Sequence, residues 1–89
     1  MKASQTRKLT IVNDLGLHAR SAAMLAKLAE AAGGRVWITK NGDTVDAASI
    51  LDILTLACPK GAEVTVSIED ERDTKILERI ATLIRSGFG

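Results

Sequence analysis

His18 is the only histidine in this chain of 89 residues, and Arg20 stands two positions after it. Both lie where an alternating, strand-like pattern changes into helical spacing. The first turn of a helix exposes backbone N–H groups and the positive end of the helix dipole, so it favours a bound phosphate. A neutral imidazole there is a good nucleophile toward phosphorus, and a neighbouring guanidinium can hold the transferred group. We therefore expect phosphoryl transfer at His18; the alternative is a histidine that only caps the helix.

Two predicted elements position this pair of side chains. A strand over Arg7–Val12 has its apolar residues at every second position and leads the chain into a turn at Gly16. A helix over Ala19–Ala32 follows. We expect Gly33 and Gly34 to end it, because glycine adopts the positive φ that helix ends often require.

The rest of the chain alternates between short strands and helices. Asn41-Gly42 between two alternating segments is a strong signal for a type I′ hairpin. Ser49, three residues before Asp52, is typical of a helix N-cap with an acidic capping-box partner. The other expected elements are strands over 35–40, 43–46 and 63–69, a short helix over 50–56 and a last helix with an apolar stripe over 76–84. This order predicts one α+β domain over residues 1–89, with its helices on one face of a mainly antiparallel sheet.

The composition argues against several classes of partner. Twelve basic and eleven acidic residues give a net charge of +1, and aromatic residues make up 2% of the chain, so nothing indicates binding to nucleic acid or an anionic membrane. The single cysteine, Cys58, cannot form an internal disulfide and does not supply the ligand set of a zinc site. Met1–Thr6 is polar, and no apolar run reaches membrane-spanning length, so we expect a cytoplasmic protein.

The short helix over 50–56 has more apolar residues than one face of a two-turn helix can bury. Exposure of Leu51, or of Leu54 together with Ile50, would create an apolar patch and indicates a protein partner. The alternative is that the rest of the domain wraps this helix more fully. Ser49 is either only the cap of the helix or a regulatory phosphorylation site.

The segment Gly16–Arg20, which reads GLHAR, resembles the active-site motif of the HPr family, the histidine-containing phosphocarriers of the bacterial phosphoenolpyruvate:sugar phosphotransferase system. Nearly the whole chain takes part in the resemblance. Three further matches are the hairpin at 41–42, the segment 45–51 and the turn at 60–61. The segments 56–61 and 84–88 look more like the nitrogen-type branch of the family, NPr.

The resemblance implies an open-faced β-sandwich, in which three helices cover one face of a four-stranded antiparallel sheet of order 1-4-2-3. It implies that Enzyme I transfers a phosphoryl group to Nδ1 of His18 and that a IIA protein then accepts it. The protein would be a monomeric carrier without metal or cofactor, not an autonomous enzyme. Arg20 would neutralise the phosphate, and the backbone N–H groups of Ala19 and Arg20 would bind its oxygens. Partners would dock on Met24, Lys27, Ile50, Leu51 and Leu54.

The chain departs from the family pattern at two positions. Ser21 replaces the usual proline, which pre-sets the first helical turn, so we expect looser geometry at the site. Ser49 matches the serine that HPr kinase/phosphorylase modifies in many bacteria, but Ala48 replaces the lysine that often precedes it, which counts against recognition by that kinase.

Other functional classes fit the sequence less well. A regulatory HPr-like protein acting through Ser49 is one alternative, although such proteins typically lack the active histidine. A small-molecule-binding regulatory domain is another. An acylphosphatase of similar element order would need a glycine-rich arginine loop that this sequence lacks.

Overall fold

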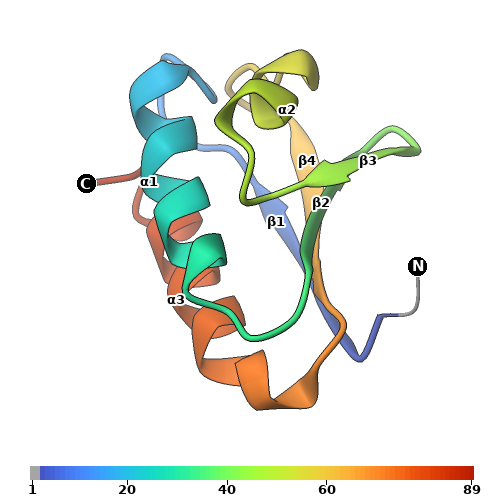
Figure 1. The fold of residues 1–89 in the computed structure, drawn as a ribbon. Helices are drawn as coiled ribbons and strands as arrows, with labels where there is room; N and C mark the ends of the chain where they lie inside the picture. The colour runs from blue at the N-terminus through green and yellow to red at the C-terminus, as the bar shows by residue number, and fades with distance from the viewer. Residues whose placement is uncertain (1–2) are drawn as a thin grey trace.

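A computed structural model describes residues 3–89, so residues 1 and 2 of the polar N-terminal segment lie outside the described part. Strands and helices alternate along the chain (Figure 1). The elements are β1 (Gln5–Thr10), α1 (Ala19–Glu30), β2 (Val36–Lys40), β3 (Asp43–Asp46), α2 (Ile50–Thr55), β4 (Glu63–Ile68), the 3₁₀ turn η1 (Glu71–Asp73) and α3 (Thr74–Arg85).

The strands form one antiparallel sheet of order β1-β4-β2-β3, and the helices lie on one side of it (Figure 1). β4 is central, since Ile68 is paired with Gln5 of β1 on one side and with Val36 of β2 on the other. The expected α+β class and the 1-4-2-3 order are therefore confirmed. The predicted hairpin also forms, with positive φ at both Asn41 and Gly42.

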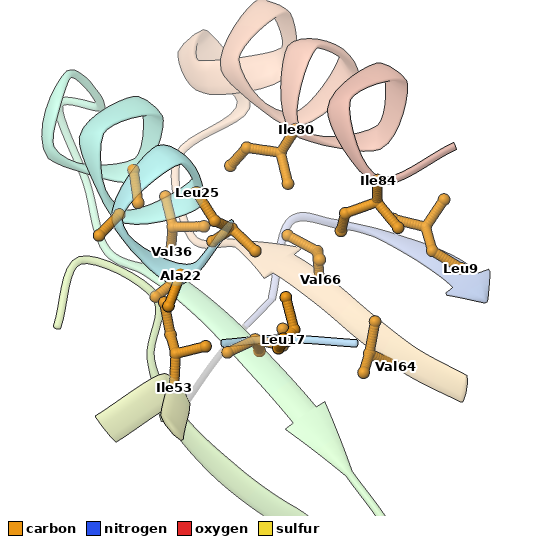
Figure 2. Close-up of a cluster of buried hydrophobic side chains, with 14 of the residues drawn as sticks. Leu9, Leu17, Ala22, Leu25, Val36, Ile53, Val64, Val66, Ile80 and Ile84 are labelled. Atoms are coloured by element: carbon orange, nitrogen blue, oxygen red, sulfur yellow. The ribbon is translucent and has the colours of Figure 1, made fainter. Parts of the chain in front are cut away.

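The core lies between the sheet and the helices, where the strand and helix periods bring apolar side chains together (Figure 2). β4 directs Val64, Val66 and Ile68 inward, and each is at most 1% exposed. The apolar stripe of α3 faces them with Leu77, Ile80, Ala81 and Ile84. Trp37 points to the other, uncovered face, where its Nε1–H donates to Glu69 at 2.7 Å.

The first strand ends two residues earlier than predicted, at Thr10. Ile11 is still completely buried, and its backbone is paired with the turn before β4 instead of with a strand. Its N–H donates to Ala62 O at 2.9 Å and its carbonyl accepts from Gly61 N–H at 2.7 Å. Val12 leaves this pairing and is 46% exposed, so the chain begins to bend toward the site there.

The end of α1 does not use the predicted positive φ of glycine. Positive φ values occur at other glycines, and neither Gly33 nor Gly34 is among them. Instead their N–H groups each donate to one carboxylate oxygen of Asp73, both at 2.9 Å. This buried carboxylate, on η1, satisfies the backbone of the turn between α1 and β2. Within residues 3–89 no helix is long and apolar enough to cross a membrane.

Candidate functional site

A tight turn at Gly16 brings the chain from β1 to α1. The Gly16 N–H donates to Asn13 O at 3.0 Å, and the Asn13 side-chain amide donates to Gly16 O at 2.7 Å. The next N–H, of Leu17, donates to Cys58 O at 2.8 Å. Gly16 has a φ of +67°, and a Cβ there would collide with the Cys58 carbonyl and lie 2.9 Å from Pro59 Cα. Only glycine therefore fits between this turn and the loop before β4.

His18 is the N-cap of α1. Its backbone is extended, with φ −118° and ψ −177°, and the helix begins at Ala19. The Arg20 N–H donates to His18 Nδ1 at 3.3 Å. Nδ1 thus presents its lone pair to the exposed donors at the helix start, and in the neutral ring the proton is on Nε2. His18 therefore caps the helix, and the capping atom, Nδ1, is also the atom expected to act as the nucleophile.

Ser21 fixes the backbone of His18 from inside the first helical turn. Its Oγ accepts from His18 N–H at 3.0 Å and lies 3.2 Å from both Gly16 O and His18 O, to either of which it can donate. The side chain is only 2% exposed. In place of the fixed φ of proline, this chain restrains the turn with hydrogen bonds.

The open side of His18 has room for a small anion. A hollow of about 270 Å³ is bordered by the imidazole, Arg20 and Met24, with Leu15 and Phe88 at its margins. Arg20 and Ala19 are exposed at the first turn. The site therefore combines a ring nitrogen, helix-start N–H groups and a guanidinium next to open space, an arrangement that can bind a phosphoryl group.

An exposed ion pair connects the neighbouring loop to the Gly16 turn. Lys60 Nζ lies 2.8 Å from Asp14 Oδ1, across the contact between the Gly16 turn and the loop before β4. The hydrogen bond from Lys60 lowers the pKa of the Asp14 carboxyl, and the two groups neutralise each other at the edge of the site.

Apolar side chains are exposed on α1 and α2, as the excess of apolar residues in α2 predicted, and Met24 also borders the hollow. Leu51 is 76% exposed, Ile50 40% and Met24 36%; Lys27 is also exposed and Leu54 half-buried. α1 and α2 pack against each other, at the same end of the molecule as the start of α1 (Figure 1). Leu15, which the sequence did not indicate as a site residue, is 77% exposed beside the hollow. The one feature of the sequence that could have indicated Leu15 is its apolar side chain in the otherwise polar turn before His18.

Ser49 caps α2, but the predicted capping box is only half formed. Its Oγ accepts from Asp52 N–H at 3.2 Å. The Ser49 N–H, which the Asp52 carboxylate would have to bind, donates to Asp46 O at 3.1 Å. The end of β3 therefore takes the place of the acidic partner.

Metal ligands do not gather in the described part of the chain. Over residues 3–89, no three His, Cys, Asp or Glu side chains are grouped as they would be around a metal ion. Cys58 lies close to the site through its carbonyl, while its thiol is buried, and burial raises the pKa of that thiol.

Comparison with known proteins agrees with this geometry. The family model described as "PTS HPr component phosphorylation site" matches residues 5–86. The chain belongs to the HPr family. It is 37% identical over 83 residues to the phosphocarrier protein HPr of Cupriavidus necator, covering 93% of each chain. It is 35% identical over 79 residues to HPr of Chlamydia pneumoniae, covering 89% of this chain and 73% of that one.

Solved structures of HPr share the whole fold. A crystal structure of HPr from Thermoanaerobacter tengcongensis matches with a TM-score of 0.90 and 32% identity, covering 96% of both chains. One from Bacillus anthracis matches with a TM-score of 0.83 and 30% identity, covering 90% of this chain and 95% of that one. This HPr-family chain is thus a phosphocarrier of the phosphotransferase system by family, and its one histidine stands at the start of α1.

Proposed function

We propose that His18 accepts a phosphoryl group on Nδ1 from the phosphohistidine of Enzyme I and passes it to a histidine of a IIA protein. The observation that carries this proposal is the placement of Nδ1 at the N-cap, 3.3 Å from the Arg20 N–H and beside an open hollow. The family membership supports the same role.

The transfer needs little from this chain beyond position and charge. The lone pair of Nδ1 attacks phosphorus in line with the donor nitrogen, so that one P–N bond forms as the other breaks. The proton on Nε2 stays on the ring during this step. Passing the group to the acceptor histidine repeats the exchange with this chain as the donor, so no metal or cofactor is required.

Arg20 and the start of α1 would stabilise the bound phosphate. The phosphoryl oxygens replace Nδ1 as the acceptor of the Arg20 N–H and also receive the Ala19 N–H. The exposed guanidinium of Arg20 can turn to the same oxygens. Because these groups face solvent until a partner docks, the phosphate remains accessible to the next protein.

The partner surface we propose combines the exposed residues of α1 and α2: Met24, Lys27, Ile50, Leu51 and Leu54, extended by Leu15. Apolar side chains next to a charged centre can exclude water when a partner binds. We propose that the chain acts as a monomer in the cytoplasm. HPr of Thermoanaerobacter tengcongensis has also been crystallised as a dimer, so sedimentation of this chain in solution tests whether it is a monomer.

Intact-mass spectrometry tests the carrier role. The protein is incubated with Enzyme I and phosphoenolpyruvate, alongside His18→Ala and an acid-treated aliquot. We expect one phosphoryl group, lost in acid and absent from His18→Ala, while far-ultraviolet circular dichroism shows that the variant keeps its fold. An adduct retained by His18→Ala would refute the assignment.

A second experiment tests the partner surface. Leu51→Glu places a charge at the most exposed apolar position of α2 and should raise the KM for phosphoryl transfer from Enzyme I by about tenfold or more. Thr6→Glu is the matched control, because Thr6 is exposed on the sheet face away from the helices. Equal KM values for both variants would contradict docking at α2.

Phosphorylation of Ser49 stays a prediction. Its hydroxyl lies beside the exposed Ile50 and Leu51, so a phosphate there would place charge on the proposed partner surface. Incubation with HPr kinase and ATP, with Ser49→Ala as control, tests this site; Ala48 leads us to expect poor labelling. If the mass experiment shows no phosphohistidine, this regulatory role and the small-molecule-binding role take precedence.

A further inference from the structure

The hydroxyl of Ser21 lies at the meeting point of the Gly16 turn and the first turn of α1. It accepts from His18 N–H at 3.0 Å and lies 3.2 Å from Gly16 O, so one atom joins the backbone on both sides of Leu17. With 2% exposure, water does not compete for these bonds. Ser21 borders the hollow, but the hydrogen bonds of its hydroxyl all join backbone atoms and none reaches Nδ1, so it acts on the backbone that carries the imidazole.

These bonds determine which N–H groups remain free for a phosphate. The N–H of His18 is one of the unpaired donors at a helix start, and Ser21 Oγ uses it. The Arg20 N–H is left for Nδ1, and later for a phosphoryl oxygen. The Gly16 carbonyl, which would repel a phosphate if it turned outward, is held by Ser21 and by the Asn13 amide.

We propose that Ser21 is a positioning residue for phosphoryl transfer, because its buried hydroxyl holds the His18 backbone so that Nδ1 stays at the start of α1. This inference rests on the proposed function of His18. Reacting groups gain rate from being held in line, and a shift of about 1 Å can cost about 10²-fold. Ser21→Ala removes the hydrogen-bond partner of the part-buried His18 N–H, so the turn can move to satisfy this N–H with water.

The test combines hydrogen exchange with transfer kinetics. His18 amide exchange is followed by NMR in the unphosphorylated protein, and kcat and KM are measured with Enzyme I and phosphoenolpyruvate. The variants are Ser21→Ala, Ser21→Thr, which keeps the hydroxyl, and Ser67→Ala. Ser67 is the matched control, being a serine 3% exposed on β4, outside the site.

We expect Ser21→Ala to speed His18 amide exchange and to lower kcat, each by about tenfold, as the loss of one such hydrogen bond would. KM should change little, because the partner surface is intact. Ser21→Thr should restore both quantities, and Ser67→Ala should leave both unchanged. Unchanged His18 exchange in Ser21→Ala, or a fall in kcat that Ser21→Thr does not restore, would overturn the positioning role. Absence of any adduct on the wild-type protein would instead contradict the proposed function, and the exchange measurement would still decide whether Ser21 holds the turn.

Discussion

Gly16→Ala is expected to destabilise the protein far more than Gly42→Ala, although both glycines have positive φ. At Gly42 an added Cβ has nothing within 4 Å, so the cost is the left-handed backbone alone, about 1–2 kcal/mol. At Gly16 the same Cβ strikes the Cys58 carbonyl and lies 2.9 Å from Pro59 Cα, and both are backbone atoms that cannot rotate away. The two loops must separate.

Separation breaks the hydrogen bond from Leu17 N–H to Cys58 O, which measures 2.8 Å. A buried backbone bond lost with its groups left unpaired costs about 1–3 kcal/mol, so Gly16→Ala should cost roughly 2–5 kcal/mol in total. The backbone cost is common to both variants, so they differ by about 1–3 kcal/mol, which corresponds to a Tm difference of roughly 4–24 °C for a domain of this size.

Urea unfolding of both variants, followed by circular dichroism, measures this difference. The phosphoryl acceptance of each variant should follow the same order, because the Gly16 turn carries His18 and the hairpin at Gly42 does not. Equal losses of unfolding free energy in the two variants would refute the reasoning, since they would show that the close approach of the loops contributes nothing.

Three further outcomes are expected elsewhere. Asp73→Asn should lower the unfolding free energy by about 1–3 kcal/mol by urea titration, because an amide offers one acceptor oxygen to two backbone N–H groups. Arg72 holds the pKa of Asp70 at about 2, so any stability from this pair is present above the ordinary carboxyl pKa and is lost as pH falls toward 2; NMR titration of Asp70 should show this value, and Arg72→Met should raise it. The Cys58 thiol should react with alkylating reagents much more slowly in the native protein than in urea, because burial removes access and raises its pKa; equal rates would contradict this.

The sequence predicted the features that depend on neighbouring residues. The alternation of Val64 and Val66 and the stripe of α3 indicated the correct layers, and Asn41-Gly42 indicated the hairpin, because local periods and turn preferences determine them. His18 was predicted at a helix start for the same reason.

The contacts that hold the site could not be predicted in the same way. Cys58 lies far along the chain from Leu17, and no local pattern indicates that its carbonyl closes the turn. Asp73, about as far along the chain from the α1–β2 turn, binds the N–H groups of Gly33 and Gly34. These glycines therefore do not need the positive φ that the sequence predicted for them. From the sequence, Ser21 indicates only that the usual proline is absent. The hydrogen bonds of its hydroxyl could not be predicted, since they depend on the folded turn.

The order of the strands has a consequence during synthesis. Within the described residues β1 is an edge strand whose neighbour is β4, and β4 is synthesised after α1, β2, β3 and α2. The carbonyl of Cys58, which holds the turn before His18, also emerges late. His18 is therefore synthesised well before the turn that positions it can form, because the sheet cannot be completed until β4 has been made. We therefore expect His18 to accept a phosphoryl group only after the whole domain has been synthesised and folded.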